Sequence, residues 1–141
     1  MATLTRVYSF VEALAEKVHN LGSDVLKIAL CNEANPPIES NTQLSDLTVI
    51  SYTNLSTRTI TRTSSSQTDG VYTLVLQNLT LTATGDVAPW RYFVIYNDTA
   101  TNDELIGYGD YGSEITLHNG ESVLLDFNVD SGILTLGESL A

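Results

Sequence analysis

The sequence has very few residues of several kinds, and each shortage excludes a class of protein. Cys31 is the only cysteine among 141 residues, which excludes an internal disulfide framework and fits synthesis in a reducing cytoplasm. Only six residues are Lys or Arg against 17 Asp or Glu, so the formal net charge is −11. A chain with this charge repels phosphate, and we therefore expect it to bind neither nucleic acid nor an anionic membrane.

Long apolar segments are also missing. The longest run without a charged residue, 70–85, has 16 residues and is interrupted by Thr, Gln and Asn, whereas a membrane-spanning helix needs about 20 apolar residues. The first apolar stretch carries Glu12, Glu16 and Lys17 at helical spacing, which is not the pattern of a secretory signal peptide. We therefore expect neither a membrane span nor a signal peptide.

Hydroxyl groups take the place of the missing charge. The chain has 18 Thr and 13 Ser but only two Lys, and charged residues make up 16% of it. Threonine is favoured on the pleated, half-buried surface of a β-sheet, so this composition predicts a β protein. The length fits one domain, 1–141, which can bury roughly 68–70% of its unfolded surface.

The N-terminal segment has the pattern of an amphipathic helix. Apolar residues recur there at spacings of three and four, which places them on one helical face: Val7, Phe10, Val11, Leu14, Val18 and Leu21. Gly22 is the residue type that most readily takes the left-handed conformation just past a helix. We predict a helix from about Thr5 to Asn20, within an N-terminal arm and helix of residues 1–22.

From residue 23 onward, the pattern changes to short β-strands. Trp90–Tyr96 is the most apolar and aromatic run, and we predict that it is the central strand. The segment with Pro36 and Pro37 is expected to be a loop, and residues 43–50 are either one helical turn or an edge strand. Further strands are expected at 24–30, 57–64, 71–76, 79–83, 104–111, 115–117, 123–127 and 133–136.

Turn residues separate these strands. Segment 64–70 is predicted to be a turn that ends in Asp69-Gly70, a strong hairpin signal, and Asn119-Gly120 and Ser131-Gly132 are expected to join later strands. Turn signals at about every 8–12 residues are typical of a two-sheet sandwich. We therefore expect a mainly β fold, a β-sandwich or jelly-roll-like unit of residues 23–141 preceded by an N-terminal α-helix.

Residues that could carry catalysis are few. Cys31 could form a thiolate pair with His19 or His118, because an imidazole can activate a thiol. Cys31 ends an apolar strand, however, where a free cysteine usually acts as a small hydrophobic residue. The His and Cys spacings match no zinc motif, and no glycine-rich loop precedes a helix. We predict no catalytic residue and no cofactor, and hence a protein that is not an enzyme.

Two ligand-binding alternatives stay open. The segment 98–104 is an acidic loop whose oxygen atoms suit calcium, although it lacks the spacing of an EF-hand; its candidate ligands are Asp98, Asn102, Asp103 and Glu104. Aromatic residues could instead form a sugar-binding face, or they could simply fill the core. These aromatic residues are Trp90, Tyr92, Tyr96, Tyr108 and Tyr111. We predict a solvated loop and a core role as the simpler interpretations.

Charge is distributed unevenly along the chain. All six basic residues lie at or before position 91, and the segment 92–141 has nine acidic residues and no basic one. Such a segment either keeps the protein soluble or forms a docking face for a basic partner.

Four segments resemble a family of small virion proteins of tailed bacteriophages. They are 9–30, which runs from the predicted helix into the first strand, 90–99 (Trp-Arg-Tyr-Phe-Val-Ile-Tyr-Asn-Asp-Thr), 105–113 (Leu-Ile-Gly-Tyr-Gly-Asp-Tyr-Gly-Ser), and 122–127 together with 132–136. The resemblance is weakest between residues 33 and 63. These segments support a fold and carry no catalytic signature.

The resemblance implies a structural protein of the particle. Within that class it favours a capsid decoration, or cement, protein on the outer surface of the head, which joins neighbouring major capsid proteins and commonly acts as a trimer. The N-terminal arm is our candidate for the contact with the shell or the trimer partner, at Thr3, Leu4, Thr5 and Arg6. A tail or tail-fibre component and a carbohydrate-binding β-sandwich module are the alternatives. Like charges repel, so the C-terminal acidic residues should face solvent or a basic patch and should not line the trimer axis.

Overall fold

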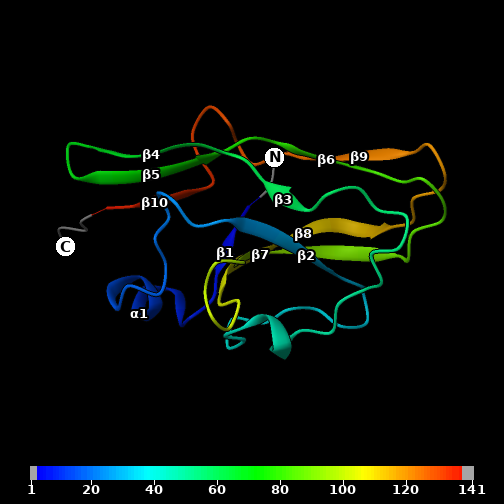
Figure 1. Cartoon of the computed structure of the whole chain (residues 1–141), viewed down its shortest axis with the longest axis horizontal. Coiled ribbons are helices and arrows are strands. Elements are labelled where there is room, and N and C mark those ends of the chain that lie inside the picture. Colours follow the sequence, from blue (N-terminus) through cyan, green and yellow to red (C-terminus); the bar gives the residue numbers. More distant parts are fainter. Residues whose placement is uncertain (1–2, 138–141) are drawn as a thin grey trace.

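The computed structural model describes residues 3–137, which form a mainly β, sandwich-like fold of antiparallel sheets (Figure 1). Its elements in chain order are β1 (Thr5–Arg6), α1 (Phe10–Ala15), β2 (Leu26–Cys31), the 3₁₀ turn η1 (Leu44–Asp46), β3 (Thr59–Ile60), β4 (Arg62–Thr68), β5 (Val71–Leu76), β6 (Leu79–Thr82), β7 (Trp90–Asn97), β8 (Leu105–Ile115), β9 (Ser122–Leu125) and β10 (Leu134–Leu136). Most of these elements are strands because β-branched and aromatic side chains alternate with Thr and Ser along the chain.

The main layer is a five-stranded sheet in the order β1-β8-β7-β2-β3. The predicted central strand is confirmed, since β7 lies between β8 and β2. Only Arg91 and Tyr92 of its eight residues escape burial, because both faces of this strand are covered. The strands β1 and β3 form the two edges of the sheet.

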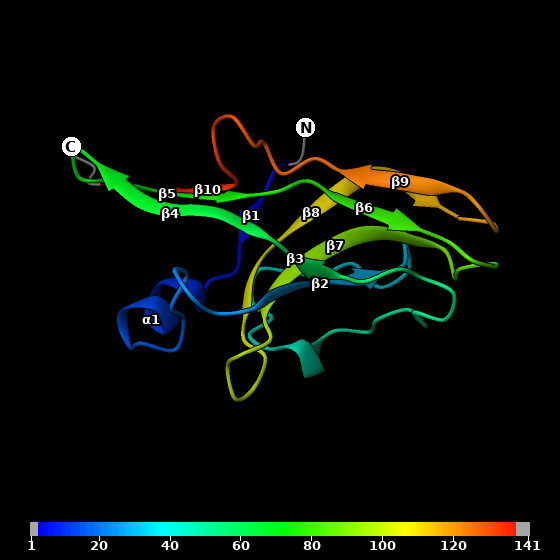
Figure 2. The ribbon, with the colours of Figure 1, turned by 45° about the horizontal axis from the view of Figure 1, so that its top comes forward.

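A second layer lies over the five-stranded sheet (Figure 2). It consists of the three-stranded sheet β10-β5-β4 and the pair β6-β9. Phe93 of β7 packs edge to face against Phe127, which follows β9, with ring centroids 5.9 Å apart. Both rings are buried, so the core lies between the layers. The three-stranded sheet projects beyond the main sheet on the side where α1 lies (Figures 1 and 2).

The segment between β2 and β3 borders and partly covers the main sheet. Leu44 and Leu47 are partly buried against the core, and Ile50 is buried. Residues 43–50 could have formed a helical turn or an edge strand, and the structure has a helical turn there, η1. A reciprocal pair of hydrogen bonds between Gln43 and Asp46 caps this turn.

The predicted N-terminal helix is wrong in its extent. The structure has a helix only from Phe10 to Ala15, and the two residues Thr5 and Arg6 form β1 instead. The helix ends early because Lys17 takes the left-handed conformation (φ 69°), whereas Gly22 does not. Thr5 and Arg6 of the predicted arm belong to the main sheet as β1.

The predicted turn at 64–70 is wrong in its extent. Residues 64–68 belong to β4 and pair with β5, so only Asp69-Gly70 forms the hairpin turn. The turns at Asn119-Gly120 and Ser131-Gly132 lead to strands that pair elsewhere, because β9 pairs with β6 and β10 pairs with β5. A turn residue shows where the chain bends, but it does not show which strands become neighbours.

Candidate partner-binding surface

The proposed partner-binding residues Thr3, Leu4, Thr5 and Arg6 lie along one edge of the main sheet. Thr5 pairs with Tyr108 and Arg6 with Gly107 of β8, and Leu4 packs against the core. The strand fits there because position 107 has no side chain: a Cβ atom on Gly107 would lie 2.7 Å from the backbone oxygen of Thr5. The arm is therefore an ordered edge strand.

The outer side of β1 is open at Arg6. The backbone N–H of Val7 donates to Ile106 of the sheet (3.2 Å), whereas that of Tyr8 donates away from the sheet, to the backbone oxygen of Glu39 (2.8 Å). Successive backbone N–H groups of a strand point to opposite sides, so the N–H of Arg6 points the same way as that of Tyr8. Within residues 3–137, no backbone hydrogen bond reaches Arg6 on this outer side, so its backbone is available there to an added strand.

A groove of about 360 Å³ lies along this edge. It is lined by Thr5, Arg6, Val7, Tyr8, Val11 and Glu39. Tyr8 is 68% exposed and Val11 57% exposed. Exposed apolar side chains that lie together often mark an interaction site. The guanidinium of Arg6 lies 6.0 Å from the ring centroid of Phe10. This edge therefore combines an open strand, a cation and apolar surface.

Sequence reasoning missed three members of this surface. Val11 was assigned to the buried face of a long helix, but the short helix turns it outward. Tyr8 was not singled out, although an aromatic residue before a helix is a signal that could have found it. Glu39 gave no signal, because only the fold of the loop that contains Pro36 and Pro37 brings it to β1.

The three candidate catalytic residues do not come together. Cys31 is buried at the end of β2 that pairs with Tyr92, and burial raises the pKa of its thiol to about 11. His19 lies near the other end of that strand, where burial lowers its pKa. His118 is exposed, and a hydrogen bond to Asp86 at 2.9 Å raises its pKa.

Two acidic side chains of the loop 98–104 make separate contacts. Asp98 lies 3.5 Å from the ammonium of Lys27, and the carboxylate of Glu104 accepts the backbone N–H of Asn102 at 2.8 Å. Within residues 3–137, no three His, Cys, Asp or Glu side chains gather closely enough to hold a metal ion.

The aromatic residues proposed for sugar binding are divided between core and surface. Trp90 is fully buried and Tyr96 is 4% exposed, so neither can stack on a ligand as the protein stands. Tyr111 is 41% exposed and meets Trp90 edge to face, with centroids 5.5 Å apart. The core interpretation therefore accounts for the two most buried members of the set.

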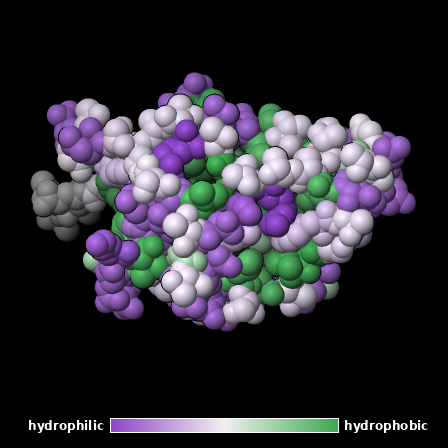
Figure 3. Space-filling model, in the orientation of Figure 1, coloured by the Kyte–Doolittle hydropathy of each residue, from purple (hydrophilic) through white to green (hydrophobic). Residues whose placement is uncertain are grey.

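Most of the basic side chains are engaged within the chain. Arg91 binds both carboxylate oxygens of Asp110, at 2.9 and 3.1 Å, and contacts Glu33 at 2.6 Å. Arg62 donates to the backbone oxygen of Asp24. Most of the acidic side chains therefore have no basic partner within residues 3–137. Figure 3 shows hydrophilic and intermediate residues over much of one face, with smaller apolar areas between them.

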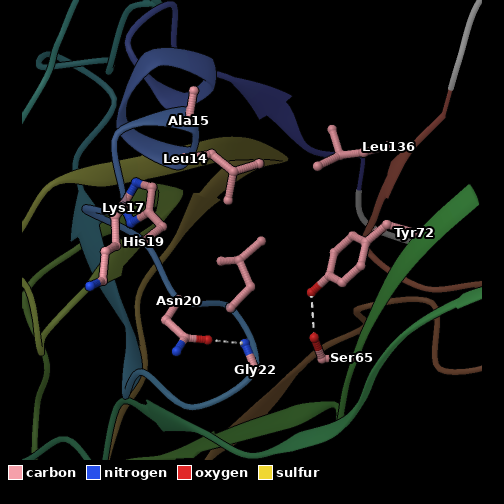
Figure 4. A pocket seen from close by; sticks show the side chains of 10 residues that line it. Leu14, Ala15, Lys17, His19, Asn20, Gly22, Ser65, Tyr72 and Leu136 are labelled. Carbon is pink, nitrogen blue, oxygen red and sulfur yellow. Dashed lines mark hydrogen bonds between the residues drawn. The ribbon is translucent and has the colours of Figure 1, made fainter.

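A separate cleft of about 570 Å³ lies between the α1 region and the three-stranded sheet. Leu14 of α1 and Leu136 of β10 face each other across it (Figure 4). On its far wall, the hydroxyl of Tyr72 is 2.7 Å from that of Ser65. The cleft separates the projecting sheet from α1.

Comparisons of the chain with protein-family models, with curated proteins and with solved structures found no match. Among residues 3–137, the helices are too short and too polar to span a bilayer.

Proposed function

We propose that this protein is a non-enzymatic structural protein of a tailed-bacteriophage virion, a decoration or cement protein on the outer surface of the head. The observation that carries the proposal is the open edge at Arg6, beside the exposed side chains of Tyr8 and Val11. An open strand edge with apolar and charged neighbours suits a protein that adds to a larger assembly.

The phage resemblance rests mainly on segments that form strands of the sheets. They include β2, β7, β8 and β9, so the likeness concerns the sheets. A jelly-roll-like connection of these sheets is part of the same proposal.

The charge of the chain supports a basic partner surface. The net charge is −11, and contacts within the chain engage Arg62 and Arg91. A shell of major capsid proteins with a basic patch would attract this surface, and electrostatic attraction speeds the encounter. The role of the protein would be to tie adjacent major capsid proteins together against internal DNA pressure.

An electron-microscopy map of the virion that contains this protein tests the location. We expect a sandwich-shaped density on the outside of the head, in contact with more than one major capsid protein. Density at the tail tip or baseplate would instead support a tail component. Binding of glycans by the purified chain, together with no density on the particle, would support a carbohydrate-binding module.

The variant Arg6→Pro tests the open edge directly. Proline removes the backbone N–H that points outward, while the ladder bond from Val7 to Ile106 is left in place. We expect the variant to fold but to bind heads much more weakly than Arg6→Ala, which loses only the charged side chain. Equal binding by the two variants would contradict strand addition at β1. Deletion of the first five residues is a poorer test, because Leu4 packs on the core and Thr5 pairs with Tyr108.

A further inference from the structure

The edge of the main sheet opposite β1 carries a groove of about 300 Å³ beside β3. Two cations line it together with three hydroxyl residues; they are Lys27, Arg58, Ser56, Thr57 and Thr59. No acidic side chain among residues 3–137 is part of this lining, although the chain has 17 Asp or Glu. The groove is therefore a local group of hydrogen-bond donors on an acidic protein, and such a group suits an anion.

Arg58 is held in place by the fold. Its Nη1 atom donates to the backbone oxygen of Ile28 at 2.7 Å, and its Cζ atom lies 3.7 Å from the ring centroid of Tyr52. Its guanidinium makes no other hydrogen bond to the described part of the chain, residues 3–137, so its remaining N–H groups can donate to a ligand. A guanidinium that is already fixed loses little conformational freedom on binding, and its planar fork matches the two oxygens of a carboxylate.

Two hydroxyl groups of the groove are left as donors. The hydroxyl oxygen of Ser56 accepts the backbone N–H of Thr82 at 2.9 Å, and that of Thr57 accepts the backbone N–H of Thr59 at 3.3 Å. No acceptor within residues 3–137 takes the proton of either hydroxyl. Each hydroxyl can therefore donate its proton to an anion in the groove.

Lys27 supplies the second cation. It lies on β2, directly across from Thr59 of β3, and its side chain is 30% exposed. Its ammonium is 3.5 Å from a carboxylate oxygen of Asp98, which is long for a charge-assisted hydrogen bond. Asp98 offsets part of the charge of Lys27, so Arg58 is the principal anion receptor and Lys27 assists it.

The charge of the chain and the lining of the groove select the kind of anion. A net charge of −11 repels an anion in proportion to its charge, so a singly charged carboxylate is repelled less than a doubly charged phosphate. The apolar lining consists only of Leu55 and of Tyr52, whose ring faces Arg58. A mostly polar lining favours a ligand with hydroxyl groups over an aliphatic acid, and the volume suits a small molecule.

We propose that this groove binds a small carboxylate that also carries hydroxyl groups, such as a sugar acid. Arg58 and the two donating hydroxyl groups hold the carboxylate, and Thr59 is available to the hydroxyl groups of the ligand. Because β3 and β1 are opposite edges of the main sheet, a ligand bound here leaves the β1 edge free for the shell. The inference goes beyond the proposed function and does not depend on where the protein lies in a particle.

Titration of the purified, isotope-labelled full chain with glucuronate, followed by NMR at constant pH and ionic strength, tests the site. We expect saturable shifts of the backbone amide signals of residues 55–60. Acetate has the carboxylate alone and glucose has the hydroxyl groups alone, so each should bind at least about tenfold more weakly than glucuronate. Inorganic phosphate should also bind more weakly. No saturable shift with glucuronate, or binding of acetate, glucose or phosphate as tight as that of glucuronate, would overturn the proposal.

Matched variants separate this site from a general effect of charge. Arg58→Lys keeps the charge but loses the planar fork, and it should weaken glucuronate binding by at least about tenfold. Arg6→Lys makes the same change at the β1 edge and should leave binding unchanged. Equal effects of these two variants would contradict the site.

A second pair of variants covers the contact between Arg58 and Ile28, on which folding could depend. Lys27→Gln should weaken glucuronate binding by a smaller factor than Arg58→Lys, and Lys17→Gln should leave it unchanged. Circular dichroism checks that each variant folds. If Arg58→Lys does not fold, equal binding by Lys27→Gln and Lys17→Gln overturns the proposal.

Discussion

The side-chain nitrogen of Asn97 lies 3.0 Å from Nδ1 of His19, and both side chains are buried. The same nitrogen donates to the carboxylate of Asp24 at 2.7 Å, while the Asn97 oxygen accepts the backbone N–H groups of Thr99 and Ala100. These four contacts use the amide fully and fix its orientation. His19 must therefore accept at Nδ1, which requires a ring that carries no proton there.

This contact predicts that acid destabilises the fold through His19. Burial lowers the folded-state pKa below the ordinary value of 6.5, and the charges of Glu104 and Asp24 only partly oppose that shift. As the pH falls below 6.5, the unfolded chain binds the proton first, so the stability contributed by neutral His19 is lost from there down to the lowered pKa. Urea unfolding at about pH 7.5 and about pH 5 should show a smaller loss in His19→Gln than in wild type.

His118 is the matched control for this experiment. Its pKa is raised by Asp86, so its charged form is favoured in the folded state. Its contribution is therefore complete below 6.5, and it is lost as the pH rises through the raised pKa. His118→Gln should thus leave the acid-induced loss at least as large as in wild type. An equal pH dependence in wild type and His19→Gln would contradict the assignment.

Lys17 predicts a stabilising substitution. It lies just past α1 with a φ of 69°, and the backbone N–H of Val18 donates to the oxygen of Ala13 at 2.8 Å, which closes a Schellman motif. A side chain in this conformation is strained, so Lys17→Gly should raise the free energy of unfolding by about 0.5–1 kcal/mol. Lys17→Ala removes the same charge but keeps a Cβ atom, and it should not stabilise. Denaturant unfolding of the three proteins measures the difference.

The sequence predicted the sheets better than the helix, and Lys17 shows why. The apolar and aromatic run 90–96 identified a strand that the fold buries on both faces. The apolar stripe from Val7 to Leu21 fitted a helix equally well, but Val7 and Leu21 on that stripe are buried outside the helix. Backbone conformation at Lys17 ends the helix, and a lysine carries no signal for a left-handed position.

Gly109 predicts a steric conflict at the candidate surface. A Cβ atom there would overlap the ring of Phe93 and lie 3.0 Å from the backbone oxygen of Thr3. Gly109→Ala should therefore lower the free energy of unfolding by about 1–3 kcal/mol and loosen the arm on β8. Gly22→Ala is the control, since its nearest contact would be 3.4 Å from Asn20; it should change stability by less than about 0.5 kcal/mol. Similar losses in both variants would show that close packing on β8 does not hold the arm.

The candidate surface could be predicted only in part. Thr3–Arg6 were chosen because an arm with a cation precedes an apolar segment, and the structure places these residues at an open edge. Glu39 could not be chosen, because it reaches the β1 edge through the long segment between β2 and β3. Its path depends on tertiary hydrogen bonds that leave no periodic pattern in the sequence.

Cys31 supplies a final prediction, which separates a structural cysteine from a reactive one. The side chain is fully buried at the end of β2, and burial raises its pKa to about 11, so the reactive thiolate is scarce at neutral pH. A thiol reagent at about pH 8 should label the native protein far more slowly than the protein in denaturant. Cys31→Ser should be less stable than Cys31→Ala by about 1–2 kcal/mol, because serine buries a hydroxyl group that needs a partner. Both variants should assemble like wild type once folded. Rapid labelling of the native protein, or assembly that fails in folded Cys31→Ala, would instead assign the thiol a chemical role.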